Sequence, residues 1–181
     1  FTAIQKNDLQ TIKLLLEKDG SLIDSVFTGM PKKFDGQSLL QVALKTANAG
    51  VVNYLLDMNA NVNFIENESC ANDWRAPVIH DAINRAIMFS RWNIMRDTEL
   101  EVYSTKEASD ESFEILKRII IMGADVNAKD SYGNACLDRA CLQARQILPR
   151  HNSDDRVLTD ELRSDLKRIF SLADRFQLCL R

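Results

Sequence analysis

The segment from Met122 to Leu137 constrains the fold of this chain more than any other part of the sequence. It reads MGADVNAKDSYGNACL, in which a glycine precedes a short polar turn and a new apolar stretch. Gly123 stands where a helix should end, because glycine adopts the left-handed conformation of a helix C-terminus without steric cost. Asp130 and Gly133 occupy the first and fourth positions of a β-turn, where these residue types are favoured. The segment therefore predicts a junction between two helices.

Related junctions and helices recur along the chain. Residues 59–63 (NANVN) align with residues 123–127 (GADVN), and residues 19–24 (DGSLID) form a looser version. Four segments carry an apolar residue followed three and four positions later by two more, which places one apolar stripe on one helix face. These stripes are Ile12/Leu15/Leu16, Val52/Leu55/Leu56, Leu116/Ile119/Ile120 and Leu166/Ile169/Phe170. The recurrence indicates a repeat protein in which each unit supplies one such helix.

The stretches that follow three of the turns resemble the G-x-T-P-L-H-x-A motif of the ankyrin repeat family. They begin at Gly36 (GQSLLQVA), Arg75 (RAPVIHDA) and Gly133 (GNACLDRA). The resemblance covers most of the chain and implies an all-α fold, an ankyrin-repeat solenoid of about four helix–turn–helix units with hairpin fingers. The implied units are approximately 1–24, 25–63, 64–127 and 128–181, which together make up a single domain.

The apolar stripes lie farther apart than the ankyrin unit of about 33 residues allows, so the chain must contain insertions. The first finger (residues 24–36) and the second finger (residues 63–75) are each longer than the third finger (residues 127–133). Longer insertions fall near residues 93–112 and 147–159, each between the two helices of one unit.

Both insertions are bounded by predicted helix ends. In the first, apolar and polar residues alternate from Glu99 to Tyr103, which favours a short strand, so this insertion is either a hairpin or a mobile loop. The helix after it should begin at Ser109 or Asp110. The second insertion should end at Thr159, whose hydroxyl can cap the last helix.

The sequence departs from the ankyrin motif at the start of the inner helices. Ser38 can cap its helix by accepting a hydrogen bond from an exposed amide, whereas Pro77 cannot. Only His80 keeps the histidine that joins neighbouring turns in the family, because Gln41 and Asp138 stand at the other two positions. We therefore expect fewer polar links between units and more reliance on apolar packing.

Charge and composition exclude several classes of partner. A net charge of −3 gives no general attraction to nucleic acid or to anionic lipid, so we expect neither as a partner. The longest apolar run, Ile119–Met122, is far shorter than the roughly 20 residues of a membrane span. The four cysteines have no CxxC spacing, so we expect reduced thiols, a cytoplasmic location and no metal; nothing indicates a small-molecule cofactor.

The resemblance also implies where a partner would bind, namely at the finger tips and on the exposed face of the inner helices. The matching positions are Phe34, Asp35, Lys45, Asp73, Trp74, Asn84, Arg85, Ser131, Tyr132, Leu142 and Gln143. Each finger tip carries an aromatic residue, and exposed aromatic side chains are typical interface anchors. An aromatic ring at a turn can also pack on its own finger, and the sequence leaves both possibilities open.

The sequence thus favours a protein–protein interaction module, not an enzyme, that holds a protein or peptide partner. One alternative is a structural or self-associating ankyrin segment of a larger polypeptide. A remote alternative is a hydrolase in which His80 acts as the base and Cys70 or Cys136 as the nucleophile. The ankyrin resemblance instead implies a hydrogen-bonding role for His80.

Overall fold

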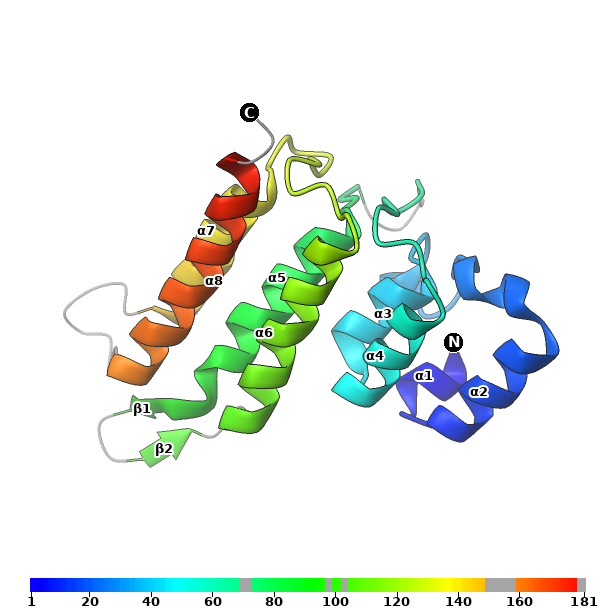
Figure 1. Ribbon diagram of the computed structural model, residues 1–181, viewed down its shortest axis with the longest axis horizontal. Helices are drawn as coiled ribbons and strands as arrows, with labels where there is room; N and C mark the ends of the chain where they lie inside the picture. The colour runs from blue at the N-terminus through cyan, green and yellow to red at the C-terminus, as the bar shows by residue number, and fades with distance from the viewer. Residues whose placement is uncertain (69–72, 97–98, 102–103, 149–158, 179–181) are drawn as a thin grey trace.

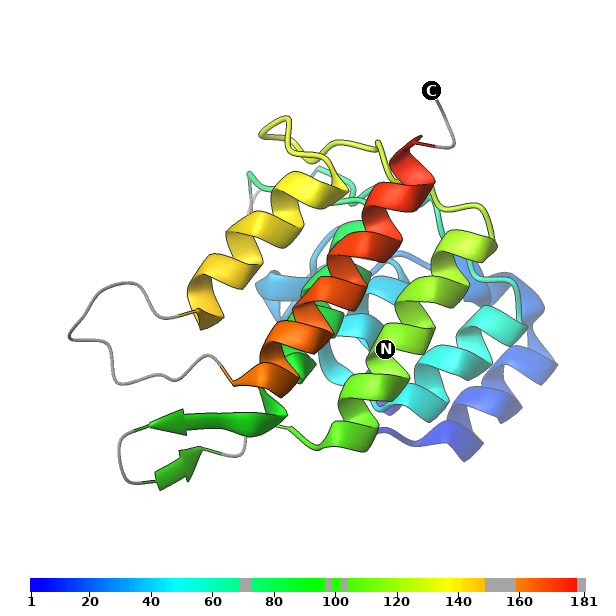
Figure 2. The ribbon, with the colours of Figure 1, turned by 60° about the vertical axis from the view of Figure 1, so that its left-hand side comes forward.

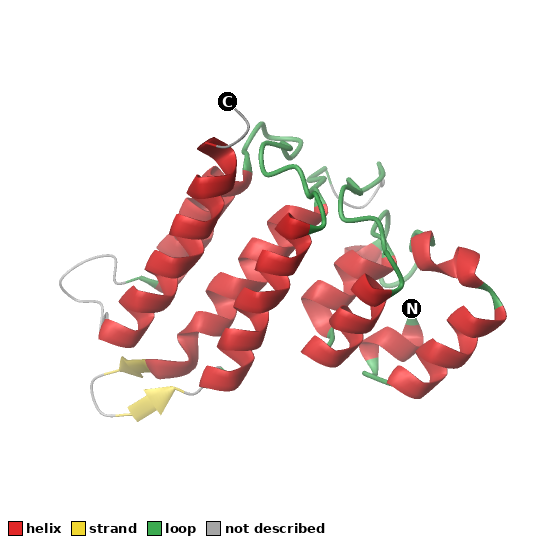
Figure 3. Cartoon of the chain, viewed as in Figure 1, coloured by secondary structure: helices red, strands yellow, loops and turns green. Residues whose placement is uncertain are grey.

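Helices account for nearly all of the regular structure. The computed structural model describes residues 1–68, 73–96, 99–101, 104–148 and 159–178, and side chains within 1–68, 73–92, 104–148 and 159–174. In this part of the chain, helices dominate and one short β-hairpin accompanies them (Figure 3). The all-α class predicted from the sequence is confirmed at this level. Among the described residues, every helix is too short or too polar to span a bilayer.

The α-helices follow one another in pairs. The first two pairs are α1 (Thr2–Gln5) with α2 (Leu9–Lys18), and α3 (Leu39–Thr46) with α4 (Ala49–Asp57). The other two are α5 (Val78–Phe89) with α6 (Lys106–Ile121), and α7 (Cys136–Ile147) with α8 (Asp160–Leu178). Short 3-10 helices lie between them, η1 (Gly20–Asp24), η2 (Lys32–Phe34) and η3 (Ser90–Asn93).

The helix pairs stack side by side in chain order (Figure 1). The inner helices α1, α3, α5 and α7 contact one another in sequence, and the outer helices α4, α6 and α8 do the same. The connections from one pair to the next lie at one end of the helices, whereas the β-hairpin lies at the opposite end (Figures 1 and 2). The three fingers therefore share one edge of the molecule.

The apolar stripes form the core between the two layers. Val52, Leu55, Leu116 and Ile119 are completely buried. In the first stripe, however, Leu15 is 47% exposed and does not join the core. The reason is that α2 belongs to the end pair of the stack and has a neighbouring pair on only one side. Close approach of the inner helices is possible because small residues line their contacts, and Ala43, Ala82 and Ala140 are fully buried.

The insertion between α5 and α6 forms a hairpin, as one of the two alternatives predicted. Strands β1 (Ile94–Arg96) and β2 (Glu99–Glu101) pair antiparallel, with Met95 opposite Leu100. Residues 102–103 of the predicted strand lie outside the described residues.

The predicted start of the next helix at Ser109 or Asp110 is wrong. Helix α6 begins at Lys106 because the Thr105 hydroxyl caps it, accepting from the Ala108 amide at 3.1 Å. Residues 106–112 are thus helix.

The last helix begins where the sequence predicted. The Thr159 hydroxyl accepts from the Leu162 amide at 3.2 Å, and α8 starts at the next residue. Buried Asp165 then fixes α8 to the rest of the stack, because it accepts from Trp92 Nε1 at 2.9 Å and from the Ser109 hydroxyl at 3.1 Å. Most of the second predicted insertion, residues 149–158, lies outside the described residues.

Candidate interaction surface

The three fingers are joined to one another by main-chain hydrogen bonds. The Asn67 amide donates to the Gly36 carbonyl at 2.9 Å, which links the first two fingers. The Ser131 amide donates to the Arg75 carbonyl at 3.0 Å, and the Arg75 amide donates back to the Ser131 hydroxyl at 3.0 Å. The fingers therefore form one continuous edge rather than independent loops.

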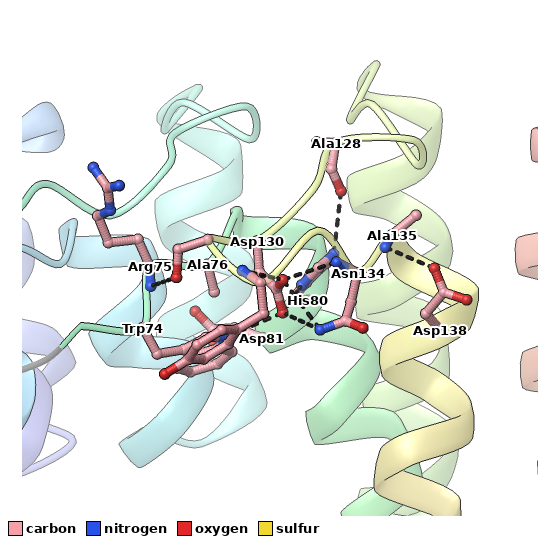
Figure 4. Close-up of polar contacts among 12 residues, drawn as sticks. Trp74, Arg75, Ala76, His80, Asp81, Ala128, Asp130, Asn134, Ala135 and Asp138 are labelled. Carbon is pink, nitrogen blue, oxygen red and sulfur yellow. Dashed lines mark hydrogen bonds and ion pairs between the residues drawn. The ribbon is translucent and has the colours of Figure 1, made fainter.

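Asp130 organises the third finger from below the surface. Its carboxylate accepts from the amides of Tyr132 and Asn134 at 3.0 and 2.9 Å, and from Trp74 Nε1 in the second finger at 3.1 Å (Figure 4). Burial alone would raise the pKa of Asp130, but the hydrogen bonds from Trp74, Asn134 and Tyr132 outweigh burial and lower it. The ionised carboxylate is therefore a structural part of both fingers.

His80 links the third helix pair to the third finger. Its side chain is fully buried, with Nε2 at 3.2 Å from the Ala128 carbonyl oxygen and Nδ1 at 4.0 Å from Asp130 Oδ2 (Figure 4). Burial lowers the pKa of His80, against the attraction of Asp130, so the ring is neutral at pH 7. The predicted hydrogen-bonding role of His80 is confirmed.

The residues proposed for hydrolysis are poorly placed for that reaction. The His80 ring has no exposed surface on which to meet a substrate. Burial raises the pKa of the Cys136 thiol to about 12, which disfavours the nucleophilic thiolate. Cys70, the other proposed nucleophile, lies outside the described residues. The described geometry therefore lends no support to the hydrolase hypothesis.

A polar cluster of partly exposed Lys45 with buried Gln41, Glu66 and Asp81 joins the second helix pair to the third. Lys45 Nζ lies 2.8 Å from Glu66 Oε1 and 3.3 Å from Asp81 Oδ1. Gln41 Nε2 donates to the Ala76 carbonyl at 2.9 Å and to Asp81 Oδ2 at 3.1 Å. The expectation of fewer polar links between these units is thus wrong, because the glutamine amide reaches the next unit from the position where the family has histidine.

The cluster gives the protein a specific dependence on pH. Burial raises the pKa of Asp81 to about 6, although Lys45 opposes the shift. A carboxyl group with a raised folded-state pKa binds more protons in the native than in the unfolded state, so its contribution to stability falls as pH rises from about 4 to about 6. We expect wild type to lose about 3 kcal/mol relative to Asp81→Asn over this range, at 1.36 kcal/mol per pKa unit.

Urea denaturation of both proteins between pH 4 and pH 7 measures this difference. Comparing the two proteins at each pH removes the contributions of all other titrating groups that they share. A difference that stays constant across the range would show that Asp81 does not titrate as its surroundings indicate.

The structure divides the predicted binding residues into three groups. Asp73, Ser131, Tyr132 and Leu142 are exposed, and Asp35, Lys45, Trp74 and Asn84 are at least partly accessible. Phe34, Arg85 and Gln143 are buried, so the prediction that a partner contacts them is not supported by their positions.

Each buried residue has partners within the chain. The Phe34 ring packs edge-on against Phe27, with centroids 6.1 Å apart. Arg85 Nη1 donates to the carbonyls of Leu44 and Ala47 at 3.1 and 2.9 Å, which satisfies the C-terminal end of α3. Gln143 lies against the Met88 sulfur. Phe34 thus packs within its own finger, whereas Arg85 and Gln143 join neighbouring units.

Trp74 has a structural role in addition to its partial exposure. Its ring lies 4.6 Å from the Arg139 guanidinium carbon and 5.8 Å from Lys45 Nζ, and its N–H donates to Asp130. Lys45 lies on α3 and Arg139 lies on α7, so Trp74 connects the second helix pair to the fourth. The sequence identified the aromatic residue but not the two cations, whose helices come together only in the folded chain.

Sequence reasoning missed two exposed residues on the finger edge, Ile65 and Lys129. Ile65 is 48% exposed, but the neighbouring Phe64 gives the finger a second apolar residue, so the sequence held no signal that singled out Ile65. Together with Arg75, Asp130 and Ser131 they line a hollow between the second and third fingers. No protein-family model matches the chain.

Proposed function

We propose that the chain is an ankyrin-repeat domain that binds another protein or a peptide and performs no covalent chemistry. The binding surface would consist of the fingers and the exposed side of α1, α3, α5 and α7, which we call the inner-helix face. The stacking of helix pairs in chain order and the hydrogen bonds between fingers support this assignment. The free thiols of Cys136 and Cys141 are in keeping with the proposed cytoplasmic location.

One observation carries the proposal of protein binding. Tyr132 on the third finger is 68% exposed, and Leu142 on α7 is 40% exposed. Both belong to the predicted binding positions, and large exposed tyrosine side chains are frequent anchors of protein interfaces. The interlocked fingers hold Tyr132 on a fixed edge, which reduces the entropy lost on binding.

Affinity capture with matched variants tests the proposal. Tyr132→Ser with Leu142→Ser removes two exposed apolar residues from the proposed surface, and Leu14→Ser with Ile121→Ser removes two from the outer helices. We expect the first variant to lose bound proteins by at least tenfold, about 1.4 kcal/mol, while the second retains them. Equal retention by both variants, with unchanged circular dichroism, would contradict the proposal.

Self-association is a second candidate, favoured by the apolar surface of the first helix pair. Leu14 is 66% exposed there, and a mostly apolar hollow of about 160 Å³ is lined by Phe1, Ile12, Leu16 and Leu22 among others. Such a surface could receive a second copy of the chain. Light scattering distinguishes the candidates, because a dimer that Leu14→Lys converts to a monomer would support self-association, and a wild-type monomer would exclude it.

A further inference from the structure

The hollow between the second and third fingers is a preformed groove on the surface. It has a volume of about 280 Å³ and is lined by Ile65 and Arg75 from the second finger and by Lys129, Asp130 and Ser131 from the third. We call this hollow the finger groove. The Ser131 hydroxyl donates to the Asp73 carbonyl at 3.0 Å, which adds a hydrogen bond between the two fingers. Because both walls are fixed by hydrogen bonds, a ligand would not have to order them.

The accessible charge in the finger groove is positive. Lys129 is exposed and, among the described residues, has no ion-pair partner. The Arg75 side chain is 40% exposed. Asp130, the acidic residue in the lining, is buried, and its carboxylate already accepts hydrogen bonds from Trp74 and the finger amides. The groove therefore presents two cations over a floor whose carboxylate is occupied.

The wall of the groove already holds a carboxylate. Glu68 Oε1 lies 2.9 Å from Arg75 Nη1, and the Glu68 side chain is 86% exposed. An ion pair this exposed contributes little to stability and exchanges readily for another. Glu68 thus occupies the position beside Arg75 that a carboxylate of a bound ligand would take. Lys129 offers a second position for such a group, and Ile65 offers an apolar surface beside them.

We propose that the finger groove binds an acidic peptide segment in which a glutamate or aspartate lies next to an aliphatic residue. This inference rests on the proposed function and names the class of partner. The carboxylate would pair with Lys129 and Arg75, displacing Glu68, and the aliphatic side chain would cover Ile65. Because the whole chain carries a net charge of −3, attraction of an acidic peptide must come from this local pair of cations.

Fluorescence anisotropy with defined peptides tests the inference. The probe is a fluorescein-labelled dodecapeptide in which glutamate alternates with valine, and the two comparison peptides replace every glutamate by glutamine or every valine by serine. We expect the probe to bind at least tenfold more tightly than the glutamine peptide and severalfold more tightly than the serine peptide. Equal binding of the probe and the glutamine peptide, or no binding of the probe up to about 1 mM, would overturn the inference.

Variants then locate the binding site. Lys129→Glu should weaken probe binding at least tenfold and Ile65→Ser about threefold, while Glu68→Gln should strengthen it by freeing Arg75. The control is Lys117→Glu on α6, a lysine that is 46% exposed outside the groove. Equal losses of probe affinity for Lys129→Glu and Lys117→Glu would show that the net charge of the protein, and not the finger groove, determines binding. That result would overturn the inference.

The outcomes separate this inference from the proposed function. If the probe fails to bind but capture still depends on Tyr132 and Leu142, the chain is an interaction module whose partner does not use the finger groove. If the probe binds at the groove and capture is indifferent to Tyr132 and Leu142, the finger groove binds acidic peptides, and the proposed role of Tyr132 and Leu142 in binding is wrong.

Discussion

Replacing Asp130 with alanine should destabilise the protein by about 4 kcal/mol, because three partly buried donors lose a buried, charged acceptor together. The carboxylate accepts from the Tyr132 and Asn134 amides and from the Trp74 indole. Urea denaturation followed by circular dichroism measures the loss.

Asp125 provides the matched control for Asp130. It lies in the same connection between α6 and α7 but is exposed, and its side chain accepts one hydrogen bond, from the Asn127 amide at 2.9 Å. Asp125→Ala should therefore cost less than about 1 kcal/mol. Equal losses for the two variants would show that Asp130 is not the centre of the finger structure.

Replacing Gly36 with alanine should also cost about 4 kcal/mol, through two separate effects. Its φ of +85° is unfavourable for residues with a Cβ atom by roughly 1–2 kcal/mol. In addition, a Cβ atom at this position would lie 2.6 Å from the Asn67 carbonyl oxygen, which is main chain and cannot move without breaking the link between the first two fingers. The free energy of unfolding should decrease by the sum of the conformational cost and the steric cost.

Gly133 separates the two effects. It has nearly the same φ, +84°, but nothing lies within 4 Å of a Cβ atom built there. Gly133→Ala should therefore show only the conformational cost of roughly 1–2 kcal/mol. If Gly36→Ala were no more destabilising than Gly133→Ala, the close approach of the second finger to Gly36 would not exist in solution.

Local signals predicted the parts of the fold that depend on short segments. Gly123 ends α6 with a φ of +94°, and Ser38 caps α3 by accepting from the Gln41 amide at 3.2 Å. The predicted start of α6 was three or four residues too late, because Thr105 is also a good cap. The sequence alone does not show which of two hydroxyl residues four positions apart, Thr105 or Ser109, caps the helix.

The candidate site was harder to predict because exposure depends on tertiary packing. Phe34 and Tyr132 are both aromatic residues at finger tips, yet Phe34 is 4% exposed and Tyr132 is 68% exposed. The difference arises from Phe27, which packs against Phe34, whereas no aromatic ring among the described residues packs against Tyr132. The two ion pairs of Lys45, with Glu66 and with Asp81, join residues 21 and 36 positions apart, which no local pattern reveals.

Hydrogen exchange of the chain, alone and bound to a partner recovered by capture, tests the central claim most directly. The claim is that the interlocked fingers and the inner-helix face form one binding surface on a stack of helix pairs. We predict that binding slows amide exchange in the third finger and along α7, with no change in α4 or α6. Protection confined to the outer helices or to the β1–β2 hairpin would contradict it.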